Sequence, residues 1–347
     1  MIPADHTTSP QKRRWRTLFG YLFALACLVW VFHDLHPRAI LHSISGMSWR
    51  WIPLAVFFDI LSYYSQGLRW SYLLHPLGRI SALESTRAIY AGLFTNEILP
   101  LRAGELVRLW LVARRLEVRF VTVIPSVVVE RFFDGIWLAL FVGLAALFVP
   151  LPKTLLHAEE VLGVIVLAVT GLVLYLVLRR EGLSEADAGS GRGVYRRLPR
   201  ALAGGWARLA RGIREIGLSR RFFLSLAVSA LILIFQIIAF WLVMRAYGLP
   251  LSLWAGAVVL LIVHFGTAIP NAPSNVGSYQ FFTVVALSMY GVDKTAATGF
   301  SIAVFFILTI PLWIIGLWAI GSTGMSLAAI RREIAALRAT PSGGARP

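Results

Sequence analysis

The stretch Asn96-Glu97-Ile98-Leu99-Pro100-Leu101-Arg102-Ala103-Gly104-Glu105 decides how the fold of this chain is interpreted. It places two carboxylates and one guanidinium beside a Pro and a Gly, at the end of an apolar segment. A charged side chain in the middle of a membrane helix costs about 2.5–3.5 kcal/mol on insertion scales, so such charges usually serve a function. Pro and Gly break a helix, and broken backbone inside a bilayer is tolerated only where protein or a water-filled cavity satisfies it. The stretch therefore predicts a re-entrant turn that lines a polar cavity.

The rest of the sequence has the composition of an integral membrane protein. Of its 347 residues, 58% are hydrophobic and the mean hydropathy is +0.73, whereas about 45–50% apolar residues is usual for a soluble domain. The net charge of +16 comes from 33 Lys and Arg against 17 acidic residues. In a membrane protein this excess is typical of cytoplasmic loops that face anionic lipids, so we expect no nucleic-acid partner. The single cysteine, Cys27, leaves no intrachain disulfide and no cysteine-rich metal site, and we expect no metal and no cofactor.

Six apolar segments are long enough to cross a bilayer as helices. They are residues 17–33, 51–75, 120–149, 160–178, 222–246 and 296–320. Two further segments are shorter or interrupted: 84–100 ends in the opening stretch, and 254–290 is broken by Pro and Gly at 270–277. We therefore predict an all-α, polytopic integral membrane protein with about six full spans plus two re-entrant helical hairpins.

The distribution of Lys and Arg predicts the orientation of these segments. If both hairpins return to their own side, the loops at 1–16, 76–119, 179–221 and 321–347 share one side and hold 26 Lys and Arg, against five on the opposite side including Arg245. Basic loops stay in the cytoplasm. We expect a basic cytoplasmic N-terminus at 1–16, one transmembrane domain at 17–320 with a basic amphipathic cytoplasmic loop at 179–221, and a cytoplasmic tail at 321–347.

The two interrupted segments share a short pattern. Pro100 to Glu105 and Pro273 to Ser278 both contain Pro, three residues, Gly and then a polar residue. Paired broken segments in two halves of a chain point to a transporter site near the membrane midplane. The six matched positions are compatible with an inverted repeat, and equally with two unrelated breaks.

The first candidate site is the group at the opening stretch: Asn96, Glu97, Arg102, Glu105 and Arg108. Glu105 and Arg108 are three residues apart and share a helix face if a helix restarts at Gly104. Glu97 and Arg102 flank Pro100 and can pair across the turn. An Arg in such a place can hold a phosphate in bidentate geometry. The alternative is a purely structural ion pair at a cytoplasmic helix end.

The second candidate site is Glu130, Arg131 and Asp134, inside the segment 120–149. Glu130 and Asp134 are four residues apart and face the same way, and Arg131 can neutralise one of them. Position 130 lies about ten residues into the span, or about 15 Å deep at the helical rise. The alternative to a binding role is a charge-balanced lock between helices.

The third candidate site is the uncharged break of the second interrupted segment. Its amides and hydroxyls can bind a lipid headgroup, a sugar or an ion, or they can simply satisfy the freed backbone. Its members are Asn271, Ser274, Asn275 and Gln280. On the second span, Asp59, Tyr63 and Gln66 form a weaker polar stripe, and we expect Arg69 to extend toward the cytoplasmic interface.

At these motifs the chain resembles the lysylphosphatidylglycerol synthase transmembrane-region family, flippase-like proteins related to the membrane half of the bacterial multiple peptide resistance factor. The carrying residues are 96–105, 129–134 and the break at 270–277, and their order covers roughly residues 10–330. Gln280 stands where members of the family usually have a Glu. The resemblance implies translocation of an anionic, aminoacylated or glycosylated lipid. Since no soluble aminoacyltransferase domain follows, it implies no synthesis of lysyl-lipid by that route.

We therefore expect a flippase-like transporter of a phospholipid or modified lipid in the bacterial inner membrane, with both termini cytoplasmic. Arg102 and Arg108 would attract a phosphate, while the carboxylates would position the headgroup or bind its amine. No Walker A, HExxH or GxSxG motif occurs, so we assign no catalytic residue and expect no enzyme. Two other readings stay open: a non-catalytic membrane partner of a lipid or polysaccharide synthase, and an intramembrane lipid-modifying enzyme. The oligomeric state is not predicted.

Overall fold

The computed structural model describes residues 10–33, 37–98, 104–149, 211–217, 219–268 and 273–322. Within these ranges the chain is helical. The elements are α1 (Pro10–Phe32), α2 (Pro37–Ser45), η1 (Trp49–Trp51), α3 (Ile52–Leu74), α4 (Ala82–Ile98), α5 (Gly104–Arg115), α6 (Phe120–Ala146), α10 (Arg220–Tyr247), α11 (Leu253–Ala268), η3 (Pro273–Asn275), α12 (Ser278–Ser288) and α13 (Lys294–Gly321).

Five of the six predicted spans correspond to α1, α3, α6, α10 and α13. The sixth, 160–178, lies outside the described residues, as do most of the predicted amphipathic loop at 179–221 and both chain ends. Within that loop, residues 211–216 are helical, and Ile213 and Ile216 are buried against the core beside α6. Helix α5 starts at Gly104, which is the condition under which Glu105 and Arg108 share a helix face.

The segment 34–50, which we expected to be a loop, contains helix α2 and the single turn η1. The prediction was wrong because apolar side chains recur there at helical spacing. Ile40 and Met47 are buried, and Met47 packs with Ile44 against Ala246 and Ala303. A short helix of this kind is stabilised by tertiary packing rather than by its own length.

The helix ends follow ordinary capping rules. Ser219 precedes α10, and its side-chain oxygen accepts a hydrogen bond from the backbone N–H of Phe222 at 3.2 Å. Asp293 does the same for α13 through the N–H of Thr295 at 2.8 Å. Helix α10 ends at Gly248, whose φ of 89° is the left-handed conformation that glycine adopts without a steric penalty.

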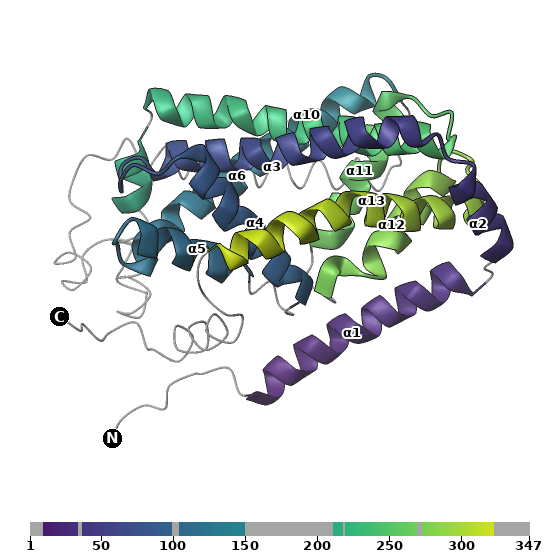
Figure 1. The fold of residues 1–347 in the computed structure, drawn as a ribbon, viewed down its shortest axis with the longest axis horizontal. Coiled ribbons are helices and arrows are strands. Elements are labelled where there is room, and N and C mark those ends of the chain that lie inside the picture. Colours follow the sequence, from purple (N-terminus) through teal and green to yellow (C-terminus); the bar gives the residue numbers. More distant parts are fainter. Residues whose placement is uncertain are drawn as a thin grey trace.

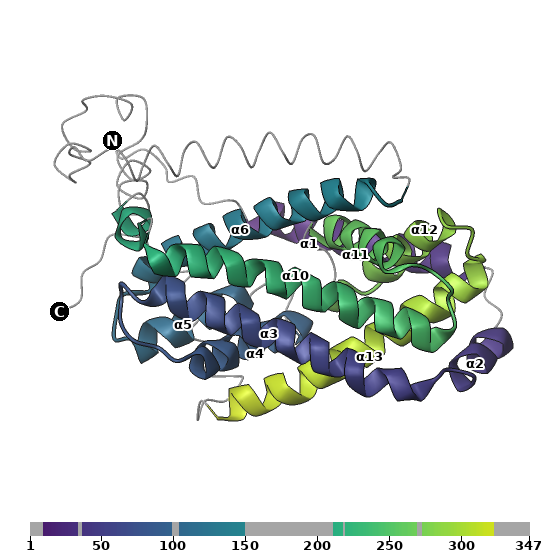
Figure 2. The ribbon, with the colours of Figure 1, turned by 90° about the horizontal axis from the view of Figure 1, so that it is seen from above.

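Helices α3 and α10 pack side by side (Figure 1, Figure 2), and Phe58 of α3 contacts Phe235 of α10 with 5.8 Å between ring centroids. In both views the pair α4/α5 lies at one end of the long axis and the pair α11/α12 toward the other. Each end has its own apolar core. One core joins α10, α11, α12 and α13, and the other joins α3, α4, α5 and α6.

The outer surface of α13 is apolar. Phe306, Ile310, Ile314 and Leu317 recur every three or four residues, and their side chains are between 44% and 65% exposed. Water-facing helices rarely present such a stripe, whereas lipid favours it. In the described part of the chain, α10 and α13 are long and apolar enough to cross a membrane on hydropathy alone. Helices α3 and α6 have similar lengths but carry charged side chains toward the interior.

The two interrupted helix pairs meet at the centre of the molecule. The hydroxyl of Ser274 in η3 donates a hydrogen bond to the backbone carbonyl of Glu97 in α4 at 3.3 Å. Within the first pair, Gly92 and Gly104 bring α4 and α5 into backbone contact, since a Cβ on Gly92 would lie 2.7 Å from the carbonyl oxygen of Gly104. Within the second break, Ser274 and Asn275 adopt positive φ angles of 58° and 52°. The two breaks are therefore in direct contact with each other.

Candidate functional site

A cavity of about 600 Å³ lies where the two interrupted helix pairs meet. Its walls are formed by side chains of α3, α4, α5, α6, α10 and α11, together with η3. This size is typical of pockets that hold a small ligand or the polar part of a larger one. The lining mixes charged groups, such as Arg131 and Asp134, with apolar side chains such as Leu93 and Leu233.

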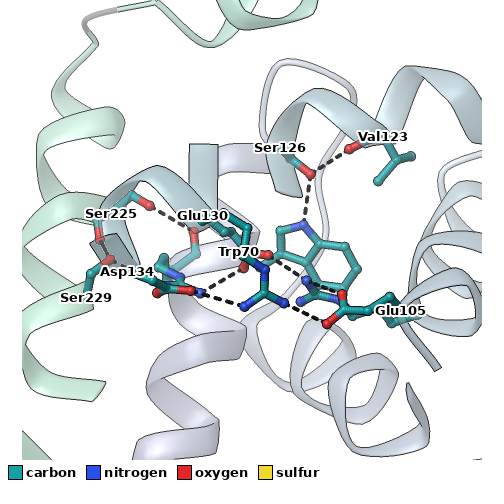
Figure 3. Close-up of polar contacts among 11 residues, drawn as sticks. Trp70, Glu105, Val123, Ser126, Glu130, Asp134, Ser225 and Ser229 are labelled. Atoms are coloured by element: carbon teal, nitrogen blue, oxygen red, sulfur yellow. Dashed lines mark hydrogen bonds and ion pairs between the residues drawn. The ribbon is translucent and has the colours of Figure 1, made fainter. Parts of the chain in front are cut away.

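Six charged side chains from α3, α5 and α6 form a closed ring beside this cavity. In the ring, each Arg contacts two carboxylates and each carboxylate contacts two Arg. We call it the charge ring, and its members in order are Arg69, Glu130, Arg108, Glu105, Arg131 and Asp134. Figure 3 shows its three carboxylates, labelled Glu105, Glu130 and Asp134, with the contacts that connect them.

One half of the charge ring is buried. The side chain of Glu130 is 0% exposed and lies between Arg69 and Arg108, which are 4% and 8% exposed. The Glu130 oxygens are 3.3 Å from Nη2 of Arg69 and 3.0 Å from Nη2 of Arg108. Arg108 also lies over the ring of Trp70 at 4.9 Å, and the indole N–H of Trp70 donates to the Ser126 hydroxyl at 2.9 Å (Figure 3). Packing on both sides therefore fixes this half.

The other half of the charge ring faces the cavity. Arg131 is 56% exposed, and its two terminal nitrogens lie 2.6 Å from Glu105 and 3.4 Å from Asp134. Glu105 also contacts Arg108 at 2.8 Å, and Asp134 also contacts Arg69. These three side chains are exposed enough to exchange partners, whereas the buried half is not.

Helix α10 completes the setting of Arg69. Its Ser229 hydroxyl lies 3.4 Å from a guanidinium nitrogen of Arg69, and its Ser225 hydroxyl donates to the Arg69 backbone carbonyl at 3.3 Å (Figure 3). A buried guanidinium needs such partners for the donors that its ion pairs leave free. Four helices thus meet at one charged network.

The charge ring is electrically balanced, with three guanidinium groups and three carboxylates. This balance allows the charges to be buried, because removing one member of a buried pair leaves the other charge without a partner and typically costs about 3–5 kcal/mol. An anionic group that enters the cavity can replace Glu105 or Asp134 beside Arg131 without uncovering the buried half. The arrangement is thus chemically able to exchange an internal carboxylate for an external phosphate.

The comparison with known families now has a structural basis. The family model of the lysylphosphatidylglycerol synthase TM region matches residues 17–316. The chain belongs to this family. The matched range contains all of the described helices from α3 to α12, and with them the charge ring and both interrupted pairs.

Two relatives are similar in sequence. A UPF0104 membrane protein of Methanothermobacter thermautotrophicus is 25% identical over 293 residues, which is 81% of this chain and 84% of that protein. Glycosyltransferase AglD of Haloferax volcanii is 28% identical over 140 residues, which is 39% of this chain but 22% of that longer protein. No solved structure matches. Family membership and the apolar helices together identify this chain as a membrane protein.

The first two predicted clusters come together in space. Glu105 pairs with Arg108 as their spacing predicted, and Arg131 pairs with Asp134. Glu130 and Asp134 face the same way, and both contact Arg69. The partners of Glu130 are therefore Arg69 and Arg108, and not its neighbour Arg131.

Our prediction for Arg69 was wrong. Its side chain does not extend to an interface but is buried within the charge ring, because two carboxylates of α6 and a hydroxyl of α10 stabilise it there. One signal in the sequence pointed to it. Arg69 is the cation that continues the polar stripe of Asp59, Tyr63 and Gln66 on the second predicted span.

Asn96 and Glu97 lie at the end of α4 and outside the charge ring. The Asn96 side-chain oxygen accepts a hydrogen bond from the backbone N–H of Gly104 at 2.7 Å, which caps α5 across the break. A Glu97 carboxylate oxygen accepts one from the indole N–H of Trp313 at 3.0 Å. Both residues line the cavity. Arg102, which we expected to pair with Glu97, lies outside the described residues.

The third cluster divides between lining and capping. Ser274 and Asn275 line the cavity. Gln280 does not, because its side-chain oxygen accepts a hydrogen bond from the backbone N–H of Gly277 at 2.8 Å and caps α12. Asn271 lies outside the described residues. Among the residues that are described, no group of three His, Cys, Asp or Glu side chains is arranged to hold a metal ion.

Proposed function

We propose that this protein is a flippase-like transporter that moves a phospholipid, or a lipid modified with an aminoacyl or sugar group, between the two leaflets. The observation that carries the proposal is the charge ring at the cavity between the two interrupted helix pairs. A site of this kind can accept a charged headgroup inside a membrane, while the acyl chains remain against the apolar helix surfaces. Paired broken helices around a central site recur in transporters that work by alternating access.

The proposed headgroup contact is Arg131. It is the most exposed cation of the charge ring, and both of its carboxylate partners are partly exposed. A lipid phosphate would replace one of these carboxylates and form a bidentate contact with the guanidinium. Because Glu105 belongs to α5 and Asp134 to α6, such an exchange would loosen one helix from the other.

The proposed topology follows the distribution of charge. The pair α4/α5 would enter as a hairpin from the cytoplasm and the pair α11/α12 from the opposite side, so that their tips meet midway. The two pairs lie toward opposite ends of the molecule, which agrees with this arrangement. Both termini would be cytoplasmic, in the inner membrane of a bacterium, as the basic loops indicate.

The second candidate is a non-catalytic membrane partner of a lipid or polysaccharide synthase. The similarity to part of a protein named as a glycosyltransferase favours it, because a related segment is present there within a longer chain. In both candidates this chain performs no chemistry of its own. They differ in whether the cavity carries a lipid or the charge ring serves to hold helices together.

Lipid movement in proteoliposomes separates the two candidates. The purified full-length protein is reconstituted with a panel of fluorescent lipids that differ in headgroup, and transfer between leaflets is followed. We expect transfer above the protein-free rate for one headgroup class, and a loss of about tenfold or more in Arg131→Gln, because one charge-assisted contact contributes about 1.5–3 kcal/mol.

The matched control is Arg115→Gln, which removes an Arg of similar exposure that pairs with Glu84 away from the cavity. It should transfer lipid at the wild-type rate. Transfer at the background rate by the wild-type protein for every headgroup would contradict the transporter. Co-purification with a synthase would then favour the partner.

A further inference from the structure

One buried carboxylate lies outside the charge ring. Asp59, on α3, is 5% exposed. Its backbone carbonyl accepts a hydrogen bond from the Ser62 hydroxyl at 2.8 Å, whereas its carboxylate forms no hydrogen bond and no ion pair with any of the described residues. Asp59 therefore takes no part in the ion pairs of the charge ring.

Tyrosines surround this carboxylate. Tyr63 of α3, Tyr90 of α4 and Tyr279 of α12 are each close enough to interact electrostatically with Asp59. The rings of Tyr63 and Tyr90 pack at 5.2 Å between centroids, and the buried Tyr90 hydroxyl has no hydrogen-bond partner. Two buried polar groups from adjacent helices thus lack partners in one place, and such groups in native structures usually indicate a ligand, a water molecule or a chemical role.

Among the described residues, no cation pairs with Asp59 from the helices packed against α3. On the side of α10, Phe58, the neighbour of Asp59 in the sequence, packs against Phe235. The carboxylate of Glu97, at the end of α4, interacts with Tyr63.

Comparison with Glu130 shows what Asp59 lacks. Both carboxylates are buried on long helices, but Glu130 has two guanidinium partners and Asp59 has none. An ionised carboxylate without a partner in such surroundings is so unfavourable that the neutral acid is the stable form. A hard metal ion takes about 6–8 oxygen ligands, whereas Asp59 is a single carboxylate on an unbroken helix. A proton needs nothing more than the carboxylate.

We propose that Asp59 is a proton-binding site that exchanges its proton with the central cavity through Tyr63. Tyr63 lies one helical turn from Asp59 and lines the cavity, whereas Asp59 does not. In the exchange, a bridging water molecule passes a proton to the Asp59 carboxylate and takes one from the Tyr63 hydroxyl, which in turn takes up one from cavity water. One proton leaves the water and one is bound by Asp59, so charge and atoms balance.

A proton at Asp59 would couple lipid movement to proton movement, and this part rests on the proposed function. While the cavity is closed, Asp59 stays neutral. A conformation that admits water beside Tyr63 allows Asp59 to ionise, because hydration stabilises the carboxylate. The binding of the proton itself does not depend on lipid transport, and it is tested separately.

Infrared difference spectroscopy of the full-length protein in lipid nanodiscs measures protonated carboxyl groups directly. Ordinary Asp and Glu side chains are ionised above about pH 6. We expect the wild type to retain a carboxylic C=O band above that pH, which Asp59→Asn abolishes and which Glu84→Gln, at an exposed carboxylate, leaves unchanged. In Tyr63→Phe, the shift of the band on transfer to D₂O should be slower than in wild type.

Absence of the band from the wild type above that pH would overturn the proposal, and so would a band that survives in Asp59→Asn. If Asp59→Asn does not fold, Asp59→Glu keeps the test, because the band must then move to the frequency of a Glu carboxyl group. Failure of the lipid-transfer assay with the band present would contradict transport alone. An unchanged rate of deuterium exchange in Tyr63→Phe would overturn the route through Tyr63.

Discussion

The two interrupted helix pairs hold similar breaks by different means. In the α4/α5 pair, Asn96 reaches across the break and its side-chain oxygen caps Gly104 at 2.7 Å. In the α11/α12 pair, Gln280 caps Gly277 from within its own helix at 2.8 Å. The first pair contributes Glu105 and Arg108 to the charge ring, whereas α11 and α12 contain no acidic or basic residue apart from a histidine.

The difference shows that a break in these helices does not need charge to be stable. The second pair satisfies its freed backbone with amides, hydroxyls and left-handed residues. The charges of the first pair are therefore not required by its turn. They are stabilised instead by α3 and α6, and this favours a role for them in binding. The following predictions test the comparison, from the largest expected effect to the smallest.

The largest effect is expected at the centre of the charged side. Glu130→Gln leaves Arg69 and Arg108 buried with a neutral neighbour, and we expect the free energy of unfolding to fall by about 3–5 kcal/mol. Unfolding in mixed detergent micelles measures it. The matched control is Arg115→Gln, which breaks an exposed ion pair on the same helix pair and should cost less than about 1 kcal/mol. Equal effects of the two changes would contradict the charge ring.

On the uncharged side, the most sensitive position is a glycine. Gly277→Ala places a Cβ against the backbone of Ala24 in α1, at a φ of 92°. We expect a loss of about 2–4 kcal/mol in the free energy of unfolding, from strain plus the collision. Gly291→Ala is the control, because Gly291 has a φ of 74° but nothing within 4 Å. The difference between the losses of unfolding free energy in the two variants measures the collision with α1. Equal losses in both variants would contradict that contact.

A smaller effect is expected at the cap of α12. Gln280→Ala removes the acceptor for the Gly277 N–H, and we expect a loss of about 1 kcal/mol, the usual value of a helix cap. Gln280→Glu keeps an oxygen in the same place and should restore most of the stability. The melting temperature of both variants in detergent decides the point. If Gln280→Ala leaves the melting temperature unchanged but abolishes lipid transfer, this residue would instead have a role in binding.

The smallest effect concerns the start of α4. The backbone N–H of Ser81 and then its hydroxyl, together with Arg115, lower the pKa of Glu84, against a smaller opposing effect of burial. A lowered folded-state pKa means that Glu84 adds stability above the pKa of the unfolded chain, about 4.3, and loses it as the pH falls through the folded value. Melting curves of wild type and Glu84→Gln should therefore differ at neutral pH and converge in acid. A difference that grows in acid would contradict the sign.

Much of the fold follows from local sequence. The lengths of the apolar segments gave the positions of α1, α3, α6, α10 and α13, and Pro and Gly marked both breaks. The pairs Glu105–Arg108 and Arg131–Asp134 were predictable because residues three apart face the same way on a helix. Helix α2 was missed, since its formation depends on contact with distant residues rather than on its own nine residues.

The sequence by itself determined where the long helices lie, where they break and where charge lies along each of them, because these depend on neighbours within a few residues. Only the tertiary structure decided which charges meet. Arg69 pairs with Glu130 and Asp134 across 61 and 65 residues, and Asp59, on the same helix, meets no cation in the described part of the chain. Which side chain lies opposite another at a given depth is set by how the helices pack, and periodicity along one helix carries no information about the helix facing it.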